Sequence, residues 1–400
     1  MEKVVLAYSG GLDTSVIIPY LKEKYKLAVI AYTANLGQKI DPDFLRQKAL
    51  KSGAIRFYFD DLRDRFVQDY IFPSLAANAL YQGKYPLATS LSRPLIAQKV
   101  AEVAKKEGAK FVSHGCTGKG NDQVRFELTW KALAPDLKII APLREWKFKS
   151  RQEEIEFAKK RGIPVPVTKK SPYSVDANLW GISIECGVLE DPGVEPPENA
   201  YQITVAPEKA PGEPKYLKIG FEKGKPVSLD GKRLGGKELI DRLNQIGAEY
   251  GVGRIDMVED RTVGLKSREI YEAPAATILI TSHQELEKMV LSRSLWELKE
   301  SLSNQYANLI YQGAWFSEKK EALDAFFQST QRYVSGLVRV KMYKGKAFVV
   351  GRSSPYSLYS EELATYGARD IFDRTSAEGF IRLTGLPLFL EGLRRKKASS

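Results

Sequence analysis

The stretch Lys3-Val-Val-Leu-Ala-Tyr-Ser-Gly-Gly-Leu-Asp-Thr-Ser15 decides the fold of this 400-residue chain. An apolar run over Lys3–Tyr8 is ended by Ser9-Gly10-Gly11, the pattern of a buried strand followed by a tight turn. Apolar residues then recur at helical spacing. The glycines let an anion approach the backbone, and the helix N-terminus offers unpaired N–H groups and the positive end of a dipole. The stretch therefore predicts an anion site at the sheet edge of an α/β fold.

Strand and helix patterns continue to alternate over residues 1–160. Strands are expected at Lys3–Tyr8, Leu27–Thr33, Ala54–Phe59, Phe111–His114 and Lys138–Ile140. Helices are expected after Ser15, over Pro42–Ser52 with Asp41 as N-cap, and from near Arg93-Pro94 to Gly108. This alternation predicts a doubly wound parallel sheet with helices on both faces.

The pattern changes around Pro164-Val165-Pro166, and an α+β region follows. Strands are expected at Tyr201–Val205, Tyr216–Phe221, Gly336–Tyr343 and Lys346–Gly351, and helices at Lys237–Tyr250 and Gln284–Ala307. We therefore expect three parts: an α/β domain over 1–165, an α+β domain over 166–365, and a C-terminal helical arm over 366–400. The arm has an apolar stripe that contains Phe380 and Phe389. The stripe fits docking on a neighbouring subunit and packing on its own domain equally well.

Two familiar phosphate-binding motifs are absent from the loop Ser9–Ser15. No lysine follows the glycines, which excludes a P-loop kinase or GTPase, and the dinucleotide fingerprint Gly-x-Gly-x-x-Gly is missing. The remaining arrangement resembles the pyrophosphate loop of N-type ATP pyrophosphatases, which cleave ATP to AMP and pyrophosphate. The acidic side chain of Asp13 is unfavourable beside a phosphate unless Mg²⁺ lies between them or the carboxylate orients a neighbouring group. The alternative is a glycine turn with a capping hydroxyl.

Composition limits the partners, metal sites and cellular location that we expect for the protein. The net charge of +12 raises the local concentration of anions, and basic residues are mixed with acidic ones along the chain, so nucleic acid is not expected as a partner. No segment has the length of a membrane span or the pattern of a secretory signal. With two cysteines and two histidines, a structural zinc site is not expected. We expect a cytoplasmic protein that holds no metal of its own, with Mg²⁺ arriving on the nucleotide.

Four further segments discriminate among ATP pyrophosphatases: Tyr85–Pro94, His114–Glu127, Ser171–Gly181 and Glu259–Tyr271. A glutaminase needs a positioned nucleophilic cysteine, and thiolation enzymes generally need cysteine pairs. Neither is present. Together with the loop, and in the same order, the four segments resemble the argininosuccinate synthase family. The resemblance implies ATP, L-citrulline and L-aspartate as substrates and a homotetramer with interlocked C-terminal arms. It also implies that 1–165 is the ATP-binding domain and 166–365 the synthetase and multimerisation domain.

The resemblance also implies a set of site residues. For ATP they are Ala7, Tyr8, Ser9, Gly10, Gly11, Leu12, Asp13, Thr14, Ser15, Ala34 and Gly115; for aspartate they are Thr117, Asn121 and Asp122. For citrulline they are Tyr85, Ser90, Asn121, Arg125, Ser174, Ser183, Glu259 and Tyr271. Arg125 falls one helical turn after Asn121, so both can face one ligand, and a guanidinium can clamp a carboxylate. Asp13 and Asp122 are the candidates for a catalytic role, with neither assigned as acid or base.

The resemblance implies adenylation chemistry. The ureido oxygen of citrulline attacks the α-phosphate of ATP, pyrophosphate leaves, and the amine of aspartate then displaces AMP from citrullyl-AMP. His114 ends a strand and is a poor candidate for an essential base. Two alternatives stay open: another ligase with a pyrophosphate loop, and a catalytically silent nucleotide- or RNA-binding protein with the same fold.

Overall fold

The computed structural model describes residues 1–146, 148, 151–164 and 172–399. They form two compact units, Met1–Tyr356 and Ser357–Ser400. The predicted domain boundary between residues 165 and 166, and Ser171 at the start of one family segment, lie outside the described residues. The division into 1–165, 166–365 and 366–400 stays a prediction.

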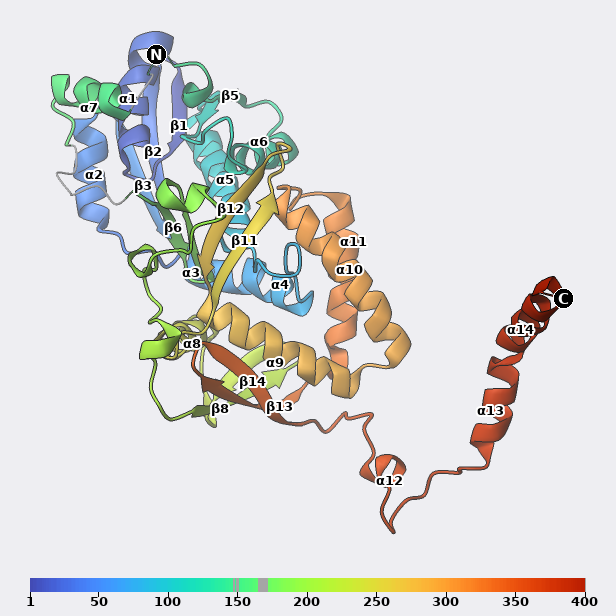
Figure 1. Ribbon diagram of the computed structural model, residues 1–400. Helices are drawn as coiled ribbons and strands as arrows, with labels where there is room; N and C mark the ends of the chain where they lie inside the picture. Colours follow the sequence, from blue (N-terminus) through green and yellow to red (C-terminus); the bar gives the residue numbers. More distant parts are fainter. Residues whose placement is uncertain (147, 149–150, 165–171, 400) are drawn as a thin grey trace. The chain divides into compact units, whose positions relative to one another are not determined.

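A five-stranded parallel sheet forms the N-terminal part of the first unit (Figure 1). Its strands are β1 (Lys3–Ala7), β2 (Ala28–Asn35), β3 (Arg56–Asp61), β4 (Phe111–Ser113) and β5 (Lys138–Ile140), in the order β3-β2-β1-β4-β5. Val4 and Leu6 share a core with Ile17 and Leu45 of the helices α1 (Leu12–Tyr25) and α2 (Pro42–Lys51). Val5 points the other way, into the core of α5 (Ala88–Glu107) and α6 (Asp122–Leu133). The predicted doubly wound sheet is confirmed.

The predicted N-cap of α2 and the predicted C-terminal end of α5 are confirmed, whereas the predicted start of α5 is wrong. The Asp41 carboxylate accepts the Asp43 and Phe44 N–H groups, both at 3.0 Å, and so caps α2. Gly108 ends α5 with a φ of +62°. The same helix begins at Ala88 rather than near Arg93, directly after Leu87 turns the chain at a φ of +67°. Pro94 is tolerated inside α5 because the burial of this helix offsets the missing backbone hydrogen bond.

Two antiparallel sheets follow in the first unit. One has the order β11-β12-β7-β6 and contains β6 (Ser174–Asn178), β7 (Gly181–Glu185), β11 (Arg254–Asp260) and β12 (Lys266–Glu272). The other has the order β10-β9-β8-β13-β14 and contains β8 (Lys215–Glu222), β9 (Lys225–Leu229), β10 (Lys232–Arg233), β13 (Gly336–Tyr343) and β14 (Lys346–Ser353). The predicted strands at 216–221, 336–343 and 346–351 are confirmed.

The remaining helices complete the first unit. They are α3 (Arg63–Phe66), α4 (Phe72–Ala76), α7 (Arg151–Lys160), α8 (Gly236–Glu249), α9 (Pro274–Val290), α10 (Arg293–Tyr311) and α11 (Glu318–Thr330). Between α3 and α4, Val67–Ile71 forms a π-helical turn. The predicted helix at 237–250 is confirmed, whereas the one at 284–307 is divided between α9 and α10 because Leu291 and Ser292 have extended backbone.

The predicted strand at Tyr201–Val205 is wrong. The backbone N–H groups of Gln202, Ile203 and Thr204 all donate to the carboxylate of Glu272, at 2.6–3.1 Å. A buried acid therefore satisfies the donors that a neighbouring strand would otherwise pair, and the segment stays irregular.

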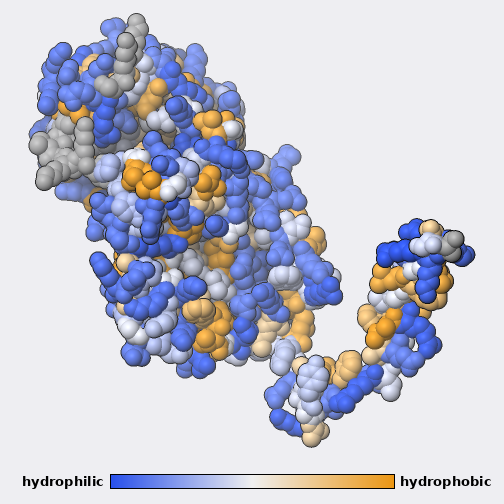
Figure 2. All heavy atoms as spheres, viewed as in Figure 1, coloured by the Kyte–Doolittle hydropathy of each residue, from blue (hydrophilic) through white to orange (hydrophobic). Residues whose placement is uncertain are grey.

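The second unit consists of α12 (Glu361–Ala364), α13 (Ser376–Thr384) and α14 (Leu386–Ser399). Its large apolar side chains are exposed, among them Phe380 at 69%, Leu383 at 75% and Phe389 at 62%. Figure 2 shows hydrophobic residues gathered along this helical segment. Among the described residues, no helix combines the length and apolar character that a membrane crossing requires.

Candidate active site

The loops after β1 and β4 meet at the carboxyl edge of the parallel sheet, as the sequence predicts. These strands are neighbours, so their loops emerge side by side. A Cβ atom on Gly115, after β4, would lie 2.8 Å from the Cγ2 of Thr14 at the start of α1. Gly115 is required here because only a residue without a side chain permits this approach.

The phosphate loop is held by its own hydroxyl groups. The Ser9 hydroxyl accepts the Gly11 N–H at 3.2 Å and lies 3.1 Å from the Thr14 hydroxyl. Ser15 donates to the Gly11 carbonyl at 2.7 Å. No side chain caps the N-terminus of α1, where Gly11 is the N-cap residue. The first turn of the helix is therefore available to an anion.

Two carboxylates stand beside this loop. Asp13, in the first turn of α1, lines the cleft, and Glu154 of α7 interacts with it. Burial and the neighbouring Asp13 raise the pKa of Glu154 to about 7. Among the described residues, one Glu154 oxygen is buried without a hydrogen-bond partner. Such a pair of oxygen donors suits a divalent cation, which would relieve the repulsion between the two acids.

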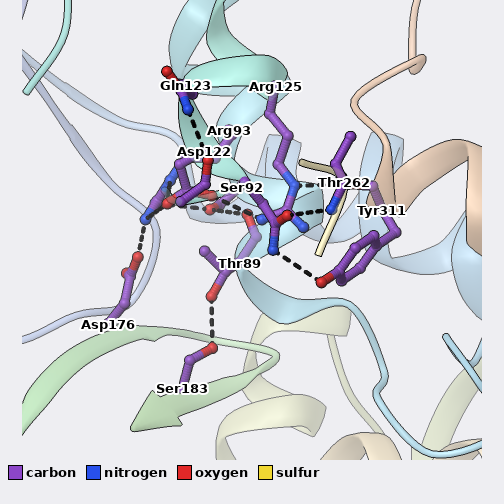
Figure 3. Close-up of polar contacts among 12 residues, drawn as sticks. Thr89, Ser92, Arg93, Asp122, Gln123, Arg125, Asp176, Ser183, Thr262 and Tyr311 are labelled. Carbon is purple, nitrogen blue, oxygen red and sulfur yellow. Dashed lines mark hydrogen bonds and ion pairs between the residues drawn. The ribbon is translucent and has the colours of Figure 1, made fainter. Parts of the chain in front are cut away.

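Two arginines enclose Asp122 at the N-terminus of α6 (Figure 3). Arg125 donates to one carboxylate oxygen at 2.7 Å, and Arg93 of α5 donates to the other at 2.8 Å. Arg93 also forms an ion pair with Asp176 on β6. Burial opposes ionisation of Asp122, but both guanidinium groups act against it and hold its pKa below the ordinary value. Asp122 is thus a weak proton acceptor, suited to binding a cationic group rather than to acting as a base.

Arg125 is 3% exposed and keeps one nitrogen free. Its Nε donates to the Tyr311 carbonyl at 2.9 Å and its Nη1 to Asp122. Nη2 is buried and has no hydrogen-bond partner in the part of the chain that the structure describes. An unsatisfied buried guanidinium nitrogen is costly unless a ligand accepts its proton. Arg125 lines the cleft, so the structure offers this donor to an anionic group there.

A second cluster joins α6 to β11, β12 and the end of α10. Glu259 accepts hydroxyl hydrogen bonds from Tyr271 at 2.6 Å and Tyr311 at 2.5 Å. Asn121 donates to the Tyr311 hydroxyl at 2.9 Å and accepts the Thr262 N–H at 2.8 Å. Burial raises the pKa of Glu259, although both tyrosine hydroxyls oppose the shift. The Asn121 side chain thus links the loop after β4 to the β11–β12 hairpin.

Aromatic rings and hydroxyls make the wall between these clusters. The Tyr85 and Tyr271 rings stack with centroids 3.9 Å apart. The Ser183 hydroxyl on β7 lies 2.7 Å from that of Thr89 on α5, which ties the antiparallel sheet to this helix (Figure 3). The hydroxyl groups of stacked tyrosine rings can form hydrogen bonds with a neutral polar ligand, while the rings exclude water from it.

An acidic wall extends the cleft along β7 and β12. Arg261 donates to Glu185 at 2.5 Å and to Glu269 at 2.8 Å, so one cation serves two carboxylates. Burial first, and the repulsion from Glu185 second, raise the pKa of Glu269 to about 8. This wall favours a positively charged group.

Residues from each of these clusters line one cleft of about 980 Å³. The predicted site residues that line it are Ala7, Tyr8, Ser9, Asp13, Thr14, Ala34, Tyr85, Gly115, Thr117, Asn121, Asp122, Arg125, Ser174, Ser183, Glu259 and Tyr271. Gly10, Gly11, Leu12, Ser15 and Ser90 are not among the lining residues. Ser15 acts inside the loop, Leu12 packs in a small core, and the fully buried Ser90 hydroxyl has no hydrogen-bond partner.

Several residues of the site were not predicted. Arg93 stood inside a segment that carries the family resemblance, yet nothing in the sequence marked it as the partner of Asp122. Arg261 and Glu269 likewise lie inside the family segment Glu259–Tyr271, where nothing singled them out. Tyr311 lies outside the four segments, and only the packing of α10 brings it to the cleft. His114 is buried, with Nε2 3.1 Å from Glu127 and Nδ1 accepting the Cys116 N–H. It has the contacts of a structural histidine.

Comparison with known families covers nearly the whole chain. Residues 3–164 match the Arginosuccinate synthase N-terminal HUP domain, and residues 173–390 match the Arginosuccinate synthase C-terminal domain. The chain belongs to the argininosuccinate synthase family.

Curated relatives agree with this membership. The argininosuccinate synthase of Chlorobium phaeobacteroides (strain BS1) is 59% identical over 387 residues, which cover 97% of this chain and 96% of the relative. That of Chlorobaculum tepidum is 58% identical over 388 residues, 97% of each chain. As a member of the argininosuccinate synthase family, the chain is an ATP-dependent ligase.

Proposed function

We propose that this protein joins L-citrulline to L-aspartate, with cleavage of ATP to AMP and pyrophosphate, through a citrullyl-AMP intermediate. The observation that carries the proposal is the single cleft that unites an uncapped phosphate loop with the unpaired Arg125 nitrogen and the Tyr85–Tyr271 wall. The phosphate loop suits ATP, and the Arg125 nitrogen and the tyrosine wall suit citrulline. The chemistry needs these groups within reach of one another.

The polar groups of the cleft match the substrates in charge. The free Nη2 of Arg125 suits the carboxylate of citrulline, and the hydroxyls of Ser183 and Tyr271 suit its neutral polar groups. The Oδ1 of Asp122 accepts one hydrogen bond, from Arg125, so a further lone pair remains for the ammonium group of aspartate. Arg93, beside it, suits a carboxylate of the same substrate.

The reaction proceeds in two displacements. The ureido oxygen attacks the α-phosphorus, the bond to the β-phosphate oxygen breaks, and pyrophosphate leaves. The aspartate amine then attacks the ureido carbon, loses a proton and expels AMP. The N–H groups at the start of α1 stabilise the phosphates, and the buried cleft aligns the reactants.

Mg²⁺ fits the donors beside the loop. Asp13 and the unpartnered oxygen of Glu154 are the hard oxygen ligands that this ion prefers, and it would neutralise charge on the polyphosphate. Among the described residues, no group of three or more metal-binding side chains is assembled.

Product analysis tests the function. Incubation with ATP, citrulline and aspartate should release AMP and pyrophosphate, and citrulline labelled with ¹⁸O at the ureido oxygen should transfer the label to AMP. Release of ADP and phosphate would refute the ligase assignment. Unlabelled AMP would refute the adenylate route alone.

We further propose a cytoplasmic homotetramer in which α13 and α14 dock on neighbouring copies. An exposed stripe that includes Phe380, Leu383 and Phe389 supports this proposal because soluble chains rarely leave contiguous apolar side chains in water.

A further inference from the structure

A buried lysine lies behind the phosphate loop. Lys48 of α2 is 1% exposed, and its Nζ donates to the Gly10 carbonyl at 2.7 Å. Leu45, one turn earlier, occupies the space beside Gly10, since a Cβ there would lie 2.1 Å from Leu45 Cδ2. Helix α2 therefore packs directly on the loop and presents one cation to it.

The charge of Lys48 has no counter-ion in the free protein. Among the described residues, no carboxylate lies within ion-pair distance of its ammonium, and the Gly10 carbonyl is its one hydrogen-bond acceptor. Burial lowers the pKa of Lys48. An uncompensated buried charge is unfavourable, and an anion bound at the loop would compensate it.

The hydrogen bond also sets the direction of a peptide group. In a planar trans peptide the C=O and N–H point in opposite directions. With the Gly10 carbonyl drawn back toward Lys48, the Gly11 N–H points away from α2 and meets the Ser9 hydroxyl at 3.2 Å. Ser9 lines the cleft, whereas Lys48 is not among the lining residues.

We propose that Lys48 is a positioning residue of the phosphate site. It turns the Gly10 carbonyl away from the polyphosphate and stabilises the bound anion by its charge from behind the loop. This inference rests on the proposed function, in which the anion is the polyphosphate of ATP. It supplies from a second helix the lysine that the loop sequence lacks.

Calorimetric titration of the full chain tests this role, with Mg²⁺-pyrophosphate and uncharged adenosine as separate probes. Lys48→Met should weaken pyrophosphate binding by about ten- to a hundredfold, the range for a lost charged interaction, and leave adenosine binding unchanged. Lys48→Arg should retain more affinity than Lys48→Met. Lys51→Met is the matched control, because it removes the same charge from an exposed position on the same helix.

Each outcome has a distinct meaning. Pyrophosphate affinity equal to wild type in Lys48→Met overturns the proposal, and so does equal loss of both probes, which would indicate a merely structural residue. If Lys48→Met does not fold, Lys48→Gln keeps a donor without the charge, and unchanged pyrophosphate affinity in that variant overturns it. If the wild-type protein binds neither probe, the proposed function itself is refuted.

Discussion

At the scale of single residues, Arg93 joins two carboxylates on different parts of the fold. Its guanidinium reaches Asp122 at the start of α6 and Asp176 on β6. A lysine ammonium lacks the planar fork and cannot keep this geometry.

Arg93→Lys should raise the KM for aspartate by about ten- to a hundredfold, because a charged hydrogen bond that positions Asp122 is lost, with little change in the KM for citrulline. Steady-state kinetics with each substrate varied in turn measures the difference. Arg242→Lys, in a surface pair with Glu238, serves as control. Equal changes in the KM values of all three substrates would contradict a specific role of Arg93 in aspartate binding.

Glu269 makes stability depend on pH. Its pKa is raised from 4.5 to about 8 in the folded chain, so the folded state binds the extra proton between these values. The associated stability is present below the ordinary pKa and is lost as the pH rises through about 8.

Glu269→Gln should flatten the fall in the free energy of unfolding between pH 5 and about 8, because the amide does not titrate. Urea denaturation at several pH values measures the slope. The exposed Glu300→Gln should keep the wild-type slope. An unchanged slope in Glu269→Gln would show that other groups cause the dependence.

At the scale of elements, the phosphate site depends on contact between the loops after β1 and β4. Gly115 and Thr14 carry that contact. A methyl group at residue 115 would also approach Ile17 Cδ1 to 3.3 Å, so the loops must separate.

Gly115→Ala should destabilise the fold by about 1–3 kcal/mol, as overpacking does, and weaken ATP binding. Adding Thr14→Ser removes the clashing methyl and keeps the hydroxyl, so the double variant should recover part of both losses. Thermal unfolding and nucleotide titration provide the two readouts. Gly212→Ala is the matched control, because Gly212, like Gly115, has no positive φ, and nothing would lie within 4 Å of its added Cβ atom. Additive effects without recovery would exclude the Thr14 contact as the cause.

At the scale of the whole molecule, the exposed stripe of α13 and α14 is the feature that assembly would bury. Light scattering should give a tetramer for the full chain and a smaller species for a chain that ends at Asp370. In the full chain, Phe380→Asp should weaken assembly, whereas Arg382→Asp, on the same helix, should have a smaller effect. A monomer at all concentrations in the wild type would refute the proposed tetramer.

The sequence by itself determined the parallel sheet, the phosphate loop and the family. These depend on contiguous residues, because strand and helix periodicity, a glycine turn and family segments are all local patterns. The strand predicted at Tyr201–Val205 failed because its N–H donors are satisfied by Glu272, far along the chain.

Only the tertiary structure decided which polar and charged groups contact each other. Asn121 meets Tyr311, Arg93 meets Asp176, and Lys48 lies under Gly10 through the packing of elements distant in sequence. Burial and neighbouring charge set the pKa values of Asp122 and Glu269, and neither can be read from residue type. The loop sequence therefore predicts where an anion would bind, and the fold places Lys48 behind that loop.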